Sequence, residues 1–345
     1  MEMGNKPVRK TFCTVVLVSL CIAIAGCGID KQRTFSGRTM GTVYHITVVT
    51  GWLTRIGTLK KAVEKKLYEI NMSMSTYIPD SEISRFNTCA KPGEPFDVSN
   101  DFLQVARTGR RLFELTGGAW DGTVWPLVRL WDFDRHDPAP SVPAEEEIKK
   151  VLRCVGYSHI HIDRTGRLTR DLPCVLLDFA SIAKGYGVDA IAGVLKNLGV
   201  HDFIVEIGGE VYASGRRKDG KPWRIGINTP RSDASVYQVR EVIELSDRAV
   251  ATSGDYRNYF VIGGRKYSHV LDPRTGWPVE TGVVSVSVVA GNCMFADGLA
   301  TALMVMGPEK GIGLVNRLDN VECVITVRHR DGAYEDYTSA GMKLD

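Results

Sequence analysis

The chain has 345 residues, of which 44% are hydrophobic, 24% are charged and 8% are aromatic, and its formal net charge at pH 7 is +3. This composition is typical of a globular protein with a substantial core, and it excludes intrinsic disorder as the main theme. The small net charge gives no basic footprint and no nucleic-acid-binding motif is found, so we expect no nucleic-acid partner.

The amino terminus has the features of a secretory leader. Three basic residues precede an apolar stretch over 12–25, which is short for a membrane span. The stretch ends in Ile24-Ala25-Gly26-Cys27, which resembles the lipobox that precedes the lipidated cysteine of bacterial lipoproteins. We therefore expect a lipoprotein signal peptide over 1–26 and a mature protein anchored through Cys27 on the periplasmic side of a bacterial envelope membrane. A plain signal peptide or an uncleaved anchor is the alternative.

Cysteine usage gives no sign of a metal site. After Cys27 an odd number of cysteines remains and no CxxC spacing occurs: Cys89, Cys154, Cys174, Cys293 and Cys323. A zinc site or a disulfide scaffold therefore has no support in the sequence. We expect buried free thiols, although one bridge in an oxidising envelope stays open.

Three helices are predicted in the first half of the chain. Apolar residues at helical spacing over 59–70, with lysines and glutamates between them, predict an amphipathic helix. Ser99 is the expected N-cap of a second helix, which should end before Gly117. A third should follow Pro143, because three glutamates favour its first turn, and the segment 134–143 should be a loop.

The second half of the chain has the pattern of short strands with two further helices. Strands are predicted over 175–178, 203–207, 223–228, 239–245, 259–262, 283–289 and 321–327, and helices over 187–198 and 296–306. Ser285 and Ser287 alternate with valines, so one face of that strand should be apolar and the other polar. Helices mixed with consecutive strands indicate an α+β fold with substantial antiparallel content.

Glycine is enriched, at 35 residues against about 24 at its usual frequency, and four clusters combine it with charged or hydroxyl residues. They span 40–42, 116–124, 178–185 and 268–276. Taken singly, each cluster favours a turn over a site.

The third cluster contains a carboxylate and an ammonium group. Asp178 ends an apolar run, where a carboxylate is costly to bury without a hydrogen-bonding or metal partner. Lys184 follows six residues later and would bring its ammonium to a helix start, whose N–H groups favour an anion. A salt bridge that caps the helix explains the pair equally well, and both interpretations stay open.

Asp297 and Thr301 stand four residues apart in a predicted helix and project from one face. A carboxylate and a hydroxyl are oxygen donors of the kind that Mg²⁺ takes. From these residues alone we favour a different role, in which Asp297 interacts with the helix dipole and Thr301 is exposed. His269 precedes the turn 272–276 and suits a base, a hydrogen-bond donor or a turn residue, and its position alone does not choose.

Together the clusters resemble the bacterial FAD:protein FMN transferases, also called the ApbE family. The matching blocks keep the family's order and are jointly specific: 40–42, 74–77, 116–124 with Pro126-Leu127, 178–189, 208–209, 252–256, 269–278 and 296–302. The resemblance implies a T-fold-like α+β enzyme, with mixed helices and a largely antiparallel sheet, whose catalytic domain is 27–345. It also implies FAD as substrate, Mg²⁺ as cofactor, and transfer of FMN to a threonine hydroxyl of a partner protein with release of AMP.

The resemblance assigns roles residue by residue. FAD would be contacted by Met40, Tyr77, Ala119, Trp120, Asp121, Asp178 and Lys184. Ser181, Asp297 and Thr301 would be metal ligands, and His269 would lie at the reacting phosphate as the best candidate for the proton acceptor. The implied partners are threonine-bearing acceptor subunits of membrane redox complexes.

Two segments depart from the family's pattern. Glu206 and Glu210 stand where the family often has Asn and Asp or Asn, and Asp178-Phe179-Ala180-Ser181 replaces the commoner Asp-Leu-Gly opening. The first departure bears on substrate contacts, and the second keeps the ligand position polar. The resemblance also allows Mg²⁺-dependent hydrolysis of FAD to FMN and AMP, and a lipoprotein that binds FAD without chemistry is an alternative of another class.

Overall fold

The computed structural model describes residues 30–133, 141–228, 239–255, 259–329 and 331–344. Cys27, the predicted leader 1–26, most of the predicted loop 134–143 and Tyr256 lie outside these residues. Within the described part of the chain, no helix is long and apolar enough to cross a membrane.

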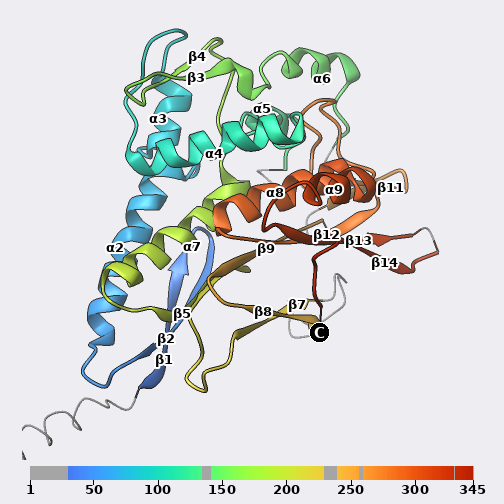
Figure 1. Ribbon diagram of the computed structural model, residues 1–345. Coiled ribbons are helices and arrows are strands. Elements are labelled where there is room, and N and C mark those ends of the chain that lie inside the picture. Colours follow the sequence, from blue (N-terminus) through green and yellow to red (C-terminus); the bar gives the residue numbers. More distant parts are fainter. Residues whose placement is uncertain (1–29, 134–140, 229–238, 256–258, 330, 345) are drawn as a thin grey trace, which may run out of the picture.

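A large antiparallel sheet forms the base of the fold (Figure 1). Its eight strands follow the order β1-β2-β5-β6-β9-β12-β13-β14, and every neighbouring pair is antiparallel. The bounds are β1 Lys31–Thr39, β2 Thr42–Thr50, β5 Asp202–Ile207, β6 Glu210–Ser214, β9 Arg248–Gly254, β12 Val283–Ala290, β13 Glu322–Arg328 and β14 Tyr334–Thr338. Two-stranded ladders pair β3 (Ile160–Ile162) with β4 (Leu168–Arg170), β7 (Trp223–Asn228) with β8 (Val239–Leu245), and β10 (Tyr259–Ile262) with β11 (Arg265–Ser268). The predicted α+β class with a largely antiparallel sheet is confirmed.

Helices cover one face of the sheet, and the β7–β8 hairpin lies on the other (Figure 1). The helices are α2 Ile56–Met74, α3 Glu82–Cys89, α4 Asn100–Thr116, α5 Trp125–Leu130, α6 Glu145–Leu152, α7 Ala180–Asn197, α8 Cys293–Met306 and α9 Pro308–Val315, with a short 3-10 helix at Tyr157–His159. Because both faces are covered, β12 is buried along its whole length. The expected polar face, which holds Ser285 and Ser287, is therefore buried as well, and the Ser287 hydroxyl bonds the Thr252 hydroxyl at 2.7 Å.

Locally encoded helix ends are where the sequence predicts them. The Ser99 hydroxyl accepts the Phe102 N–H as N-cap of α4, and Gly117 ends that helix in the left-handed region with φ 59°. The amphipathic segment 59–70 lies within α2 and buries its apolar positions. A helix follows Pro143 as predicted.

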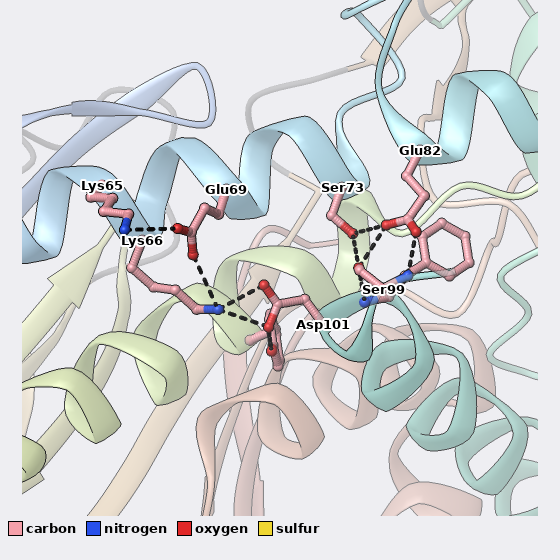
Figure 2. Close-up of polar contacts among 9 residues, drawn as sticks. Lys65, Lys66, Glu69, Ser73, Glu82, Ser99 and Asp101 are labelled. Atoms are coloured by element: carbon pink, nitrogen blue, oxygen red, sulfur yellow. Dashed lines mark hydrogen bonds and ion pairs between the residues drawn. The ribbon is translucent and has the colours of Figure 1, made fainter. Parts of the chain in front are cut away.

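Polar contacts join the helices to one another (Figure 2). Lys66 of α2 reaches both carboxylate oxygens of Asp101 on α4, at 2.7 and 2.8 Å. The Tyr186 hydroxyl of α7 donates to the same carboxylate at 2.6 Å. Glu82 of α3 accepts from the Ser99 hydroxyl at 2.7 Å. These contacts fix α7, which carries two of the predicted site residues, against α2 and α4.

Two predicted elements around 175–187 are corrected. Residues 175–178 are not a strand: Val175 and Leu177 are buried, but the Leu177 backbone bonds the Asn87 side chain instead of a neighbouring strand. The following helix begins at Ala180 and not at residue 187. Gly185, in the part of the helix that was not predicted, allows close contact with α8.

The expectation of buried free thiols is correct for Cys293 and Cys323 and wrong for the other three cysteines after Cys27. Cys154 and Cys174 form a disulfide, and Cys89 is exposed. The bridge joins the end of α6 to the segment that leads into Asp178. Pairing of residues that are 20 apart depends on the path of the chain between them, which local spacing does not encode.

Replacing Cys154 and Cys174 together with serine should lower the free energy of unfolding by about 3 kcal/mol, because the bridge closes a loop in the unfolded chain. Urea denaturation of the oxidised wild type and the double variant measures the difference. Cys89→Ser is the matched control and should leave the midpoint unchanged. Equal midpoints for all three proteins would show that the bridge contributes nothing to stability.

The α7–α8 contact depends on Gly185. A Cβ atom there would lie 2.5 Å from the Cys293 carbonyl oxygen and 2.8 Å from Asp297 Cβ. The Gly185 N–H donates to Asp297 Oδ2 at 2.9 Å, and Asp189, one turn further along α7, accepts the Cys293 and Met294 N–H groups at 2.8 Å each. Close approach and capping therefore fix Asp297 against α7.

Gly185→Ala should lower the free energy of unfolding by about 2 kcal/mol or more, because the backbone carbonyl opposite cannot move aside without shifting α8. Gly193→Ala, on the same helix, meets nothing within 4 Å and should stabilise by about 0.5–1 kcal/mol. Paired thermal and urea unfolding measures both changes. Similar effects of the two substitutions would contradict the close-packing role of Gly185.

Candidate active site

A cavity of about 490 Å³ opens between the first turns of α7, the middle of α8, the start of β6 and the end of β9. The predicted site residues among its lining are Tyr77, Ala119, Trp120, Asp121, Asp178, Ser181, Lys184, His269, Asp297 and Thr301. These residues come from segments more than 200 positions apart. The sequence-predicted residues are thus brought to one place, with Met40 as the exception among those that the structure describes.

The segment after α4 forms one wall of the cavity. Trp120 is buried and its indole N–H donates to the Ser181 hydroxyl at 3.0 Å. Asp121 accepts from the Thr123 N–H and hydroxyl and from the Tyr157 N–H, at 2.6–3.1 Å. Burial raises the pKa of Asp121, and these hydrogen bonds oppose the rise. Asp121 therefore holds the wall in shape as well as lining the cavity.

Asp178 and Ser181 stand at the start of α7. The Asp178 N–H donates to the Gly122 carbonyl at 2.8 Å, and its carboxylate accepts the Ala180 N–H at 2.8 Å. Burial raises the pKa of Asp178 against that hydrogen bond. The carboxylate thus caps the first turn of the helix, on which Ser181 and Lys184 are three residues apart and share a face.

Lys184 lies between two buried carboxylates. Its Nζ atom is 3.0 Å from Glu210 Oε1 and 3.7 Å from Asp297 Oδ2. Burial lowers the pKa of Lys184, but the two carboxylates outweigh burial and the net pKa is raised. Burial raises the pKa of Asp297, with Lys184 and the Gly185 N–H opposing. The ion-pair interpretation of Lys184 is correct, although its partners are Glu210 and Asp297 and not Asp178.

Glu210 is a member of this cluster that the sequence interpretation did not place in the site. It follows the Gly208-Gly209 turn and begins β6 with a 3% exposed side chain. Burial and the charge of Asp297 raise the pKa of Glu210 to about 8, against the effect of Lys184. Its Oε2 atom has no hydrogen-bond partner among the described residues. The sequence signal that could have placed Glu210 in the site was its departure from the residue that the family often has at this position.

The α8 side of the cavity offers oxygen donors for a metal. Asp297 is 2% exposed at the fifth position of the helix, so the expected role at the helix dipole is wrong, and Thr301 is half-buried instead of exposed. The Thr301 hydroxyl faces Ser253 of β9 at 3.0 Å. The described residues hold no group of three or more His, Cys, Asp or Glu side chains that could bind a metal. A carboxylate with the hydroxyls of Thr301 and Ser181 is a hard-oxygen set, which suits Mg²⁺ and not zinc.

His269 reaches the cavity from the segment that follows β11. Its neighbours are fixed: the Ser268 hydroxyl accepts the Val270 N–H at 3.1 Å, and Val270 and Val279 pair through a 2.9 Å backbone bond. Arg274 and Asp272 close the turn beyond with bonds of 2.8–2.9 Å. The half-buried imidazole is therefore carried on an ordered segment.

Tyr77 and Met40 lie toward the edges of the site. The Tyr77 side chain is 80% exposed at the rim of the cavity. Met40 occupies the turn between β1 and β2 with φ 48°, followed by Gly41 with φ 71°, as in a two-residue hairpin turn. Its side chain packs near Gly187 of α7. Val124, Trp125, Val128 and Phe133 add apolar surface to the cavity.

Comparison with known proteins places this geometry in a family. A FAD:protein FMN transferase from Vibrio cholerae is 43% identical over 331 residues, covering 95% of this chain and 97% of that protein. One from Haemophilus influenzae is 36% identical over 342 residues, covering 97% and 98%. The flavin transferase ApbE from Vibrio cholerae superposes with TM-score 0.81 and 42% identity, covering 90% of this chain and 98% of that one. The apo flavinyl transferase ApbE from Pseudomonas stutzeri also gives 0.81, at 38% identity and 90% and 95% coverage.

The family match spans the residues that build the cavity. The ApbE family profile covers residues 40–325, from the β1–β2 turn into β13. The sequence match to the Vibrio cholerae relative and the structural match to the Vibrio cholerae ApbE structure each cover at least 90% of this chain. The resemblance expected from the motif blocks is confirmed, and the chain belongs to the ApbE family.

Proposed function

We propose that this chain transfers the FMN half of FAD to a threonine hydroxyl of a partner protein and releases AMP, with Mg²⁺ bound in the cavity. The observation that carries the proposal is the cavity where Lys184, Glu210 and Asp297 meet beside hydroxyl donors. Relatives named FAD:protein FMN transferase and flavin transferase ApbE match along the chain. Acid-rich cavities with one ammonium suit a phosphate ligand that arrives with a cation.

FAD is the proposed occupant of the cavity. Its volume of about 490 Å³ is within the range of small-molecule sites. We assign isoalloxazine and adenine contacts to Tyr77 at the rim and to the wall at 119–121, with Met40 and Asp178 as further FAD contacts. Trp125 and Phe133 supply apolar surface for ring packing.

Mg²⁺ fits the donors present. It would be held by Asp297, Ser181 and Thr301, which line one cavity. Asp297 is buried and shares the ammonium of Lys184 with Glu210, so the cluster has more carboxylates than cations. When bound, Mg²⁺ supplies Lewis-acid stabilisation of negative charge on the phosphates. Lys184 adds a fixed positive charge toward the pyrophosphate, held in place by Glu210.

The proposed reaction needs one bond to break and one to form. The threonine oxygen attacks the FMN phosphorus in line, the phosphoanhydride bond to AMP breaks, and AMP leaves with the bridging oxygen. We assign the threonine proton to His269, which lines the cavity on an ordered segment.

Incubation with FAD and Mg²⁺, with and without a threonine-bearing acceptor domain, tests the function. The proposal predicts AMP release only with acceptor, matched by FMN covalently bound to it. AMP without acceptor would identify an FAD hydrolase, and no AMP in either case would identify a flavin-binding protein.

The same proposal includes a location and a partner class. We propose that Cys27 is lipidated after removal of 1–26, because the segment that ends at Cys27 resembles a lipobox. The lipid would anchor the domain 27–345 on the periplasmic side of an envelope membrane. Stable anchoring needs more than one acyl chain, and lipoprotein cysteines carry several. Acceptors would then be threonine-bearing subunits of redox complexes in that membrane.

Asp297→Asn should lower the rate of AMP release at saturating FAD by about 100-fold and abolish its response to Mg²⁺. The amide keeps the shape and an acceptor for the Gly185 N–H, so the free energy of unfolding should change by less than about 1 kcal/mol. A Mg²⁺ titration of turnover, with urea unfolding alongside, measures both. EDTA should reproduce the loss in the wild type. A variant that unfolds early but responds normally to Mg²⁺ would make Asp297 structural.

His269→Ala should lose about 10²–10⁴-fold in transfer rate and still bind FAD, because the ring contacts are assigned elsewhere. Single-turnover AMP release with saturating FAD and acceptor measures the rate, and flavin fluorescence measures affinity. His161→Ala, an exposed histidine paired with Asp171, is the control and should behave as wild type. A normal saturated rate with weakened FAD binding would recast His269 as a binding residue.

A further inference from the structure

The turn between β2 and α2 exposes two large apolar side chains. The Thr54 N–H bonds the Gly51 carbonyl at 3.1 Å, which places Trp52 and Leu53 at the two central positions of a β-turn. Trp52 is 63% exposed and Leu53 is 73% exposed. Gly, Pro, Asn, Asp and Ser usually fill such positions. An exposed Trp-Leu pair there indicates a contact surface.

The turn is held rigidly in this exposed arrangement. The Arg33 guanidinium on β1 donates to the Gly51 carbonyl at 2.7 Å, the Thr54 carbonyl at 2.8 Å and the Thr50 hydroxyl at 2.8 Å. Both ends of the turn are therefore tied to the neighbouring strand. Trp52 and Leu53 are presented outward without the entropy cost of ordering a loop on contact.

The turn lies beside the point where the described chain begins. Lys31, the first residue of β1, pairs with Thr50, the last residue of β2. Lys31 is four residues after Cys27 in the sequence, and four residues span at most about 14 Å. A lipid-anchored Cys27 therefore keeps this end of the molecule next to the bilayer.

The charges around the turn complement an anionic lipid surface. Lys31 and Arg55 are exposed, and neither has an ion-pair partner within the described ranges. Arg55 precedes α2, whose N-terminus has no side-chain cap and no acidic residue in its first turn. The positive end of a 19-residue helix thus points out at the same place. Asp30 is the acidic residue adjacent in sequence.

We propose that the Trp52-Leu53 turn docks into the headgroup region of the bilayer that carries the lipid anchor. The proposal rests on the proposed lipidation of Cys27. Tryptophan favours the membrane interface, and Lys31 and Arg55 with the α2 N-terminus meet the lipid phosphates. Since the acyl chains supply the affinity, docking of the turn fixes the orientation of the enzyme.

Docking sets the height of the cavity above the bilayer. β2 runs from the turn for nine residues, which is a length of about 26 Å. At its far end Val43 accepts the N–H of Gly208, which lines the cavity. Figure 1 shows β1 and β2 at the opposite end of the molecule from α5 and β11. The acceptor threonine must then be presented well clear of the headgroups.

Fluorescence quenching tests the docking. The purified full-length lipidated protein is placed in vesicles of equal parts phosphatidylcholine and phosphatidylglycerol with brominated acyl chains, which quench nearby tryptophans. Trp52→Phe should remove most of the quenching, because Trp120, Trp131 and Trp223 are buried, and the half-buried Trp125 and Trp277 lie in α5 and against Trp131, away from the turn. Adding Tyr68→Trp in that background places an equally exposed indole, at a position 67% exposed, about 18 Å along α2, and should not restore quenching. Flotation and AMP release are measured in parallel.

Each outcome decides the proposal. Quenching that depends on Trp52 supports docking. Cys27→Ser protein that floats equally well would show that acyl chains at Cys27 do not supply the affinity, which overturns the lipidation on which the proposal rests. Protein that floats with quenching unchanged by Trp52→Phe overturns docking and leaves anchoring intact. Protein that does not float overturns both. A monomer-dimer shift on Trp52→Ser without a quenching difference would assign the turn to a second copy. Transferase failure shows separately as lost AMP release.

Discussion

One half-buried ammonium shared by two buried carboxylates constrains the rest of this structure. Lys184 lies between Glu210 and Asp297, on three elements that the sheet and its helices must bring together. Losing the ammonium would leave two buried carboxyl groups without their shared positive partner, which is destabilising. The helices can approach this closely only because Gly185 has no side chain. The close α7–α8 contact therefore sets both the ion pairs and the shape of the cavity. It also leaves the Asp297 carboxylate and the hydroxyls of Ser181 and Thr301 in the cavity lining.

Signals carried within a few residues were predictable from the sequence. Ser99 and Gly117 bound α4 because a cap and a left-handed glycine act on their own neighbours. The strand 223–228 was predicted with its observed bounds because the turn residues on either side of it are also a local signal. The site was found through eight short blocks, none decisive singly, whose joint order identifies the family. Lys184 was left open between an anion site and an ion pair, and the structure shows the ion pair inside the cavity.

Features that depend on distant partners were not predictable. The run 175–178 is apolar like a strand, yet the backbone of Leu177 bonds the side chain of Asn87, 90 residues earlier, and the Asp178 N–H bonds the Gly122 carbonyl. The Cys154–Cys174 bridge and the burial of β12 on both faces depend on chain path in the same way. Glu210 was noted in the sequence as a departure that bears on substrate contacts, and only the fold shows it paired with Lys184.

The central claim is that the cluster of Lys184, Glu210 and Asp297 binds FAD and Mg²⁺ together. The most direct measurement is the affinity of the wild-type protein for FAD, by flavin fluorescence at fixed pH, in excess Mg²⁺ and in EDTA. Mg²⁺ beside the FAD phosphates would offset their negative charge, so we expect FAD to bind at least about ten-fold more tightly with Mg²⁺. Because coupling between two ligands is reciprocal, Mg²⁺ should bind more tightly with FAD by the same factor. Equal FAD affinity in Mg²⁺ and in EDTA would contradict the account.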